Sequence, residues 1–150
     1  MDLAHWLLVF AAIVVLYVVG EIWFAQIVIY PLFAKVGEAE YVAYHRFYSG
    51  RIPLPVIIPG FASFFLPVLL MFVRPESVPL WLAAANAAFA IVGLLVTVVF
   101  EIPRHRRLEQ HGKNERTIWE LTRYNWPRTL SITSCGFLTT AMLLSAFAPI

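Results

Sequence analysis

The chain of 150 residues is 61% hydrophobic and only 13% charged, and its formal net charge is +2. A soluble domain is nearer half apolar and about a quarter charged, so this composition is typical of an integral membrane protein. The small net charge gives no reason to expect nucleic acid as a partner. A single cysteine, Cys135, excludes a disulfide framework and a cysteine-based metal cluster.

Four apolar segments are long enough to cross a bilayer, which takes about 20 residues each. We expect spans near residues 6–33, 52–73, 79–102 and 127–147, forming a single four-span transmembrane domain over residues 1–150. The first segment lacks the basic start and the cleavage site of a signal peptide, and we expect it to be retained as a span. The predicted fold class is all-α: an integral membrane four-helix bundle with short interfacial helices in loops 1–2 and 3–4.

Prolines set the expected ends of the last two spans. Pro103 disfavours a helical conformation at Ile102, so the third span should end there. Pro127 would interrupt a helix that began earlier, but it fits the first turn of a new helix with Asn125 as its N-cap. The stretch "NERTIWELTRY" (114–124) would then form a separate interfacial helix.

The basic residues are distributed unevenly between the two ends of the predicted bundle. Of the eleven Lys and Arg residues, three lie in loop 34–51, six lie in loop 103–126, and Arg128 follows directly. The opposite end has Arg74 alone. Because basic loops tend to stay in the cytoplasm, we expect both loops to be cytoplasmic. Both termini should then lie on the outer side of the inner (plasma) membrane.

Acidic residues and histidines near this basic end are not explained by topology. Glu21 interrupts an apolar run, and an intramembrane carboxylate usually faces a protein interior and has a functional role. Glu101 closes the third predicted span, His105 follows four residues later, and His45 lies in the other loop on the same side. We therefore predict that these four side chains converge at one depth in the membrane.

These four residues support more than one interpretation. Structurally, Glu21 would be protonated or paired with an arginine, Glu101 would be an interfacial acid beside the basic stretch 104–107, and the two histidines would be solvated or hydrogen-bonded. Functionally, Glu21, Glu101 and His105 are candidate catalytic residues. Together with His45 they are also a sufficient ligand set for iron, zinc or manganese, although no H-E-x-x-H motif or repeated E-x-x-H spacing is present.

Further residues near the same end are candidates for substrate binding. Arg128 either anchors the fourth span at the interface or holds an anionic or carbonyl group of a substrate, with Asn125 beside it. Trp119 is either an interfacial aromatic residue or a wall of an apolar pocket. His45 completes the predicted binding set.

The stretches "IPRHRRL" (102–108) and "WELTRYNWPRTL" (119–130) resemble the signature region of the anthrone-oxygenase-like family of small membrane proteins. The positions that fit its order are Pro103, Leu108, Trp119, Asn125 and Arg128. The stretch from Gly20 to Tyr30 and Pro31 is similar more loosely, and His105 stands where most members have asparagine, which is typical of a divergent branch. The resemblance covers the last third of the chain well. It implies a four-helix membrane fold and, from the members that give the family its name, oxidation of anthrones to anthraquinones.

Three functions remain open. The first is a membrane oxidoreductase or oxygenase for a lipophilic aromatic (anthrone- or quinol-like) substrate at the cytoplasmic face. In it Glu21 or Glu101 removes a proton, the histidines relay protons or bind a metal, and Arg128 and Asn125 stabilise an oxyanion. The second is a non-catalytic accessory subunit with an internal salt-bridge network. The third is a metal- or haem-binding membrane protein or a transporter component.

The first function requires no cofactor, because an anthrone-like carbanion reacts with oxygen directly, whereas the third requires a transition metal or haem. The expected partners are the lipid bilayer and a lipophilic small molecule. A homo-oligomer is a further alternative.

Overall fold

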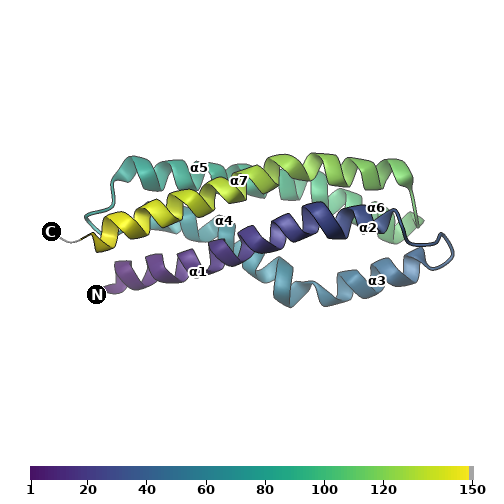
Figure 1. Cartoon of the computed structure of the whole chain (residues 1–150), viewed down its shortest axis with the longest axis horizontal. Coiled ribbons are helices and arrows are strands. Elements are labelled where there is room, and N and C mark those ends of the chain that lie inside the picture. Colours follow the sequence, from purple (N-terminus) through teal and green to yellow (C-terminus); the bar gives the residue numbers. More distant parts are fainter. Residues whose placement is uncertain (149–150) are drawn as a thin grey trace.

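The computed structural model describes residues 1–148, which form helices and no strands, so the all-α prediction is confirmed. Four helical stretches are long and apolar enough to cross a membrane: Leu3–Phe33, Pro53–Leu70, Leu80–His111 and Glu115–Phe147. They run side by side along the long axis of the molecule (Figure 1). The chain is therefore an integral membrane four-helix bundle.

The four spans differ in their internal construction. The first consists of α1 (Leu3–Phe24), the π-helix η1 (Ala25–Ile29) and α2 (Tyr30–Phe33), and a loop connects it to α3 (Tyr41–Arg51). The second consists of the π-helix η2 (Pro53–Ile57) and α4 (Ile58–Leu70). The third consists of α5 (Leu80–Val96), the π-helix η3 (Thr97–Glu101) and α6 (Ile102–His111), and the fourth is α7 (Glu115–Phe147).

Each π-helix lies just before a proline: Pro31, Pro59 or Pro103. Proline has no N–H to donate, and its ring collides with the carbonyl group one turn earlier, so a regular α-helix is disfavoured at this point. A wider turn avoids the conflict, as where the N–H of Ile102 bonds to the carbonyl group of Thr97, five residues back. The prediction that the third span ends at Ile102 is therefore wrong, because the helix passes this proline and continues to His111.

The fourth span also departs from the prediction. It begins at Glu115, and the stretch 114–124, predicted to be a separate helix, is continuous with the span. The N-cap is Asn114, whose side chain accepts a hydrogen bond from the N–H of Thr117 at 2.8 Å, and Asn125 lies inside the helix. Pro127 lies on an exposed face of α7, and packing of the other faces against α1 and α5 keeps the helix continuous through it.

Aromatic residues divide the bundle into two parts. Trp23 and Trp126 make an edge-to-face contact with ring centroids 5.7 Å apart, and both are partly exposed, as is typical at a membrane–water boundary. The exposed Trp6 lies roughly 25 Å away along α1, at about 1.5 Å per residue, which is close to the thickness of a hydrocarbon layer. If these two levels bound the hydrocarbon layer, the helices extend beyond it at the end that carries loops 34–40 and 112–114.

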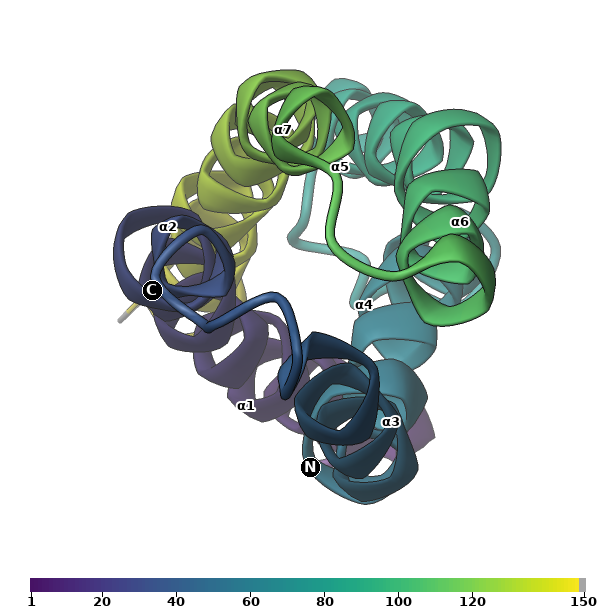
Figure 2. The ribbon, with the colours of Figure 1, turned by 90° about the vertical axis from the view of Figure 1, so that its right-hand side faces the viewer.

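Beyond this boundary, α2, α3, α6 and the first turns of α7 form what we call the loop-end layer. Viewed from that end, α2, α3, α6 and α7 follow one another around a ring (Figure 2). The layer has its own core, which includes Phe33, Tyr41, Leu108 and Leu121, all 0% exposed. Helix α3 is the short helix predicted for loop 1–2, whereas α6 is a continuation of the third span that was not predicted.

Candidate functional site

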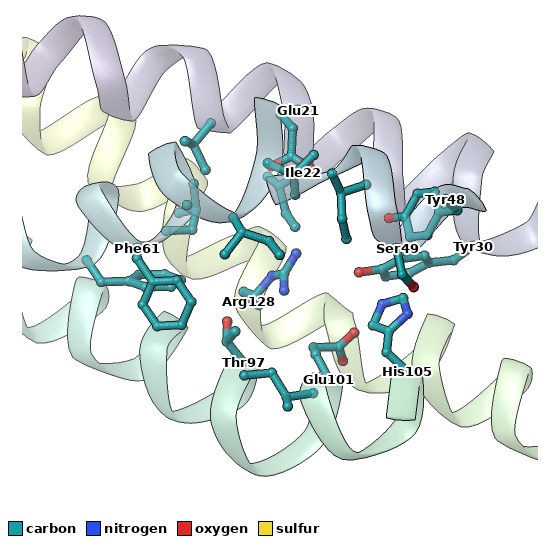
Figure 3. A pocket seen from close by; sticks show the side chains of 18 of the residues that line it. Glu21, Ile22, Tyr30, Tyr48, Ser49, Phe61, Thr97, Glu101, His105 and Arg128 are labelled. Carbon is teal, nitrogen blue, oxygen red and sulfur yellow. The ribbon is translucent and has the colours of Figure 1, made fainter. Parts of the chain in front are cut away.

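A cavity of about 310 Å³ lies where the membrane part of the bundle meets the loop-end layer. Most of its wall is apolar, and Figure 3 shows Phe61 at one end and Tyr48 and His105 at the other. The polar lining residues are Glu21, Tyr30, Tyr48, Ser49, Thr97, Glu101, His105, Arg106, Glu109 and Arg128. A volume of this size is at the small end of ligand pockets in proteins.

The π-helices and their adjoining residues supply much of this polar wall. Thr97 and Glu101 are the first and last residues of η3, and Tyr30 follows η1 directly. π-helical turns occur often at functional sites, because the wider turn changes the direction of side chains without ending the helix. In this protein the turns that accommodate prolines also bring polar side chains to the cavity.

Glu101 is the most unusual residue in the cavity. It is 1% exposed, and neither of its carboxylate oxygens has a hydrogen-bond partner among the described residues. Buried polar atoms are nearly always hydrogen-bonded, and an isolated carboxylate in an apolar environment is costly. The hydroxyl group of Tyr30, which also lines the cavity, is close enough to interact with this carboxylate, and the cavity leaves space for a ligand beside it.

Arg128 extends from α7 and lies between Glu21 and Glu101 in the cavity (Figure 3). The ion pairs found among residues 1–148 are His5–Asp2, Arg104–Glu120, Lys113–Glu115 and Arg116–Glu120. None of them includes Glu21, Glu101 or Arg128. Glu21, Glu101 and Arg128 thus face a common space without direct ion pairs, which differs from the internal salt-bridge network of the accessory-subunit hypothesis.

The structure brings the two predicted histidines into contact. Nε2 of His45 lies 3.3 Å from Nδ1 of His105. His105 lines the cavity, whereas His45 is 0% exposed behind it and packs against Tyr41 and Phe33, with ring centroids 5.9 and 5.4 Å away. Burial lowers the pKa of His45, against a smaller opposing effect of Glu109, so this imidazole favours its neutral form.

Tyr48 and Tyr30 are two site residues that the sequence analysis missed. The pKa of Tyr48 is raised to about 12, first by burial and then by the carboxylate of Glu21, while Arg128 opposes the shift. At neutral pH its hydroxyl group is therefore a hydrogen-bond donor toward the cavity. Tyr48 lies three residues after His45 on one helix, so helical spacing from that histidine would have identified it. No comparable signal marks Tyr30.

Asn125 and Trp119 lie outside the cavity. Asn125 is 0% exposed and donates a hydrogen bond to the side-chain oxygen of Gln26 at 2.8 Å, while Gln26 donates to the carbonyl group of Thr122 at 2.9 Å. These bonds hold α7 against η1. Trp119 is 58% exposed, with the guanidinium group of Arg123 5.5 Å from its ring. Their positions fit structural and interfacial roles and do not place them against a ligand in the cavity.

The four candidate metal ligands do not assemble into a metal site. Over residues 1–148, no group of three or more His, Cys, Asp or Glu side chains is arranged to hold a metal ion. His45 and His105 contact each other, and the two glutamates line the cavity beside Arg128.

Comparison of the chain with models of protein families, with curated proteins and with solved structures finds no match. The resemblance to the anthrone-oxygenase-like family stays a prediction. Function must therefore be inferred from the cavity and its lining residues.

Proposed function

We propose that the protein is a membrane oxidoreductase or oxygenase that binds a lipophilic aromatic molecule in this cavity and removes a proton from it. The observation that carries the proposal is that the buried carboxylate of Glu101 shares the cavity with the guanidinium group of Arg128, and that neither forms an ion pair among residues 1–148. A base needs a free carboxylate, and a nearby cation stabilises the negative charge that forms on the substrate. The mostly apolar wall suits a ligand that dissolves in the bilayer.

The proposed substrate is an anthrone-like ketone, in which a methylene group is acidic because its carbanion is conjugated with a carbonyl group. Glu101 removes the methylene proton, while Arg128 and the hydroxyl group of Tyr48 hydrogen-bond to the carbonyl oxygen as it becomes an enolate. Protonated Glu101 then returns this proton to the peroxide anion described below, which regenerates the base, and His105 lines the cavity next to His45 as a hydrogen-bonding group.

Dioxygen is the oxidant in this proposal. The carbanion adds to O₂, the resulting peroxide anion takes up a proton, and the hydroperoxide loses water to leave a second carbonyl group. One methylene group and one O₂ thus give one carbonyl group and one H₂O, with four electrons passing from carbon to oxygen. The steps assigned to the protein are binding, proton transfer and stabilisation of the enolate.

We further propose that the loop-end layer lies in the cytoplasm and that the protein resides in the plasma membrane with both termini outside. Ten of the eleven Lys and Arg residues, counting Arg128, lie at the loop end of the bundle. They belong to loops 34–40 and 112–114, to α3, and to the loop-end parts of the third and fourth spans. Arg74 is at the opposite end. Basic segments are retained in the cytoplasm during membrane insertion, which supports this orientation.

The reaction is tested with purified protein in lipid nanodiscs, with anthrone as the probe, by following oxygen uptake and anthraquinone formation. We expect the wild-type protein to exceed the rate in empty nanodiscs. Glu101→Gln should lower the protein-dependent rate about 100-fold or more, the usual contribution of a general base. Arg128→Gln should lower it by a similar factor through loss of enolate stabilisation.

Glu76→Gln is the matched control, because Glu76 is exposed at the other end of the bundle, and it should keep the full rate. A wild-type rate equal to that of empty nanodiscs would reject the reaction. A fully active Glu101→Gln variant would reject the assignment of the base.

A further inference from the structure

The cavity reaches the surface of the bundle on one side, between the second and third spans. Ile57 of η2 and Ile102 of α6 both line the cavity, and they are 40% and 47% exposed. On the membrane side of this point α4 packs against α5, and on the loop side α3 packs against α6. The π-helices η2 and η3 make no comparable contact with each other. We call this gap the side opening, and its rim is Ile57 and Ile102.

On its other flank, the second span is tied to the first. Here α1 packs against α4, and the hydroxyl group of Tyr17 donates a hydrogen bond to the carbonyl group of Pro55 at 3.0 Å. Pro59 cannot bond to this carbonyl group within the helix because it has no N–H, so Tyr17 supplies the missing donor. The hydrogen bond fixes η2 to the first span.

The rim of the side opening is apolar and lies at the depth of the bilayer edge. Ile102 is adjacent to Glu101, which shares the cavity with Arg128. Arg128 is two residues from Trp126, which marks the membrane–water boundary together with Trp23. The polar lining residues Arg106 and Glu109 lie farther along α6 toward its loop end. An opening with isoleucines on its rim at this depth borders lipid chains.

We propose that the ligand enters the cavity sideways from the bilayer, through the side opening, and that it is an uncharged, lipid-soluble molecule. The route follows from the rim and the helix contacts, and only the chemistry at Glu101 rests on the proposed function. An ion would leave its hydration shell at high cost to pass two isoleucines, whereas an uncharged aromatic molecule passes from lipid without that cost. Because the cavity contains both acidic and basic side chains, it does not favour a ligand with a net charge of either sign.

A cysteine inside the cavity reports the route. Thr97 lines the cavity and is 8% exposed, so Thr97→Cys in a Cys135→Ala background places one thiol there. In nanodiscs we compare its labelling by pyrene maleimide, which dissolves in the bilayer, with labelling by a sulfonated maleimide that stays in water. Labelling after denaturation verifies the free thiol. We expect the bilayer-soluble reagent to react faster.

The rim is then filled with the pair Ile57→Trp and Ile102→Trp, which should slow pyrene maleimide labelling at least about tenfold by occupying the gap. The matched control pair is Leu54→Trp and Val99→Trp. These residues are 77% and 56% exposed on η2 and η3 but do not line the cavity, so labelling should keep its rate.

Faster labelling by the sulfonated reagent, an unchanged rate in the rim pair, or no labelling by either reagent would overturn the proposal. The labelling rate does not depend on catalysis. A wild-type protein that is inactive with anthrone would reject the proposed reaction and leave the labelling result as it stands, so the two failures are distinguishable.

Discussion

His45 and Glu101 are both buried, but the chain satisfies their polar atoms differently. His45 meets His105 through one ring nitrogen, and the hydroxyl group of Ser49 lies 3.5 Å from the other. Glu101 has no such partner for either oxygen among the described residues. Because buried polar groups are normally hydrogen-bonded, His45 fits a supporting position behind the cavity, and Glu101 fits a position that faces a ligand.

The burial of His45 predicts a pH-dependent stability. Its pKa is lowered in the folded protein, so the unfolded chain binds this proton more readily, and stability falls as the pH drops below the ordinary value of 6.5. One proton gives a slope of at most about 1.4 kcal/mol per pH unit. Thermal unfolding between pH 7 and 5 should show the loss, and His45→Phe should reduce the slope. His111→Phe, at an exposed position, is the control, and an unchanged slope in His45→Phe would contradict the prediction.

At the scale of the elements, one side chain joins α6 to α7. Arg104 forms an ion pair with Glu120 at 3.2 Å, and its guanidinium group lies 4.5 Å from the centre of the Tyr124 ring. It also donates a hydrogen bond to the carbonyl group of Phe100 in the π-helix that precedes it. The side chains of Arg104 and Glu120 are only 14% and 16% exposed, so solvent screens this pair less than a surface pair. Arg104 therefore fixes the segment that carries His105.

Loss of this contact should loosen α6 without unfolding the bundle. We expect Arg104→Met to raise amide hydrogen exchange over residues 102–111 about tenfold, because an ion pair and a cation–π contact are lost together. Exchange in α5 should stay the same. Arg107→Met, at an exposed position on the same helix, should leave exchange unchanged, and equal effects of the two substitutions would show that Arg104 does not hold α6.

The lengths of the spans were harder to predict than their existence. Continuous apolar runs mark all four helices, because membrane insertion depends on composition over about 20 residues. The prolines were misleading, since the expected breaks at Pro103 and Pro127 assume that a helix ends where a backbone hydrogen bond is lost. Packing against neighbouring helices and a π-helical turn keep both helices continuous, and neither effect can be read from the local sequence.

At the scale of the whole molecule, the sequence predicted part of the candidate site. Glu21, Glu101, His105 and Arg128 line one cavity, and a polar group in an apolar segment is a strong signal for such positions. Tyr30 and Tyr48 were missed because aromatic residues are common in membrane helices and interfaces. Trp119 and Asn125 were assigned to the site from their order in the sequence. The direction of a side chain depends on which face of the helix it occupies, and for α7 that face could not be predicted while the start of the helix was predicted wrongly.

The orientation of the molecule is tested with two single cysteines. In the Cys135→Ala background, Glu76→Cys lies in the 71–79 connection and Glu38→Cys lies in the 34–40 loop, both at exposed positions. Because the basic loops should be cytoplasmic, a membrane-impermeant maleimide added to intact cells should label only the Glu76→Cys variant. Labelling of Glu38→Cys alone would reverse the topology, and permeabilised cells, in which both should react, provide the control.

The side opening has a consequence for how activity would be measured. A molecule that enters through a gap bordered by lipid chains is drawn from the membrane phase, so the effective concentration is its amount per lipid and not its amount per litre. Adding empty vesicles would then dilute the substrate and slow turnover, even though the quantities of protein and substrate in the tube are unchanged.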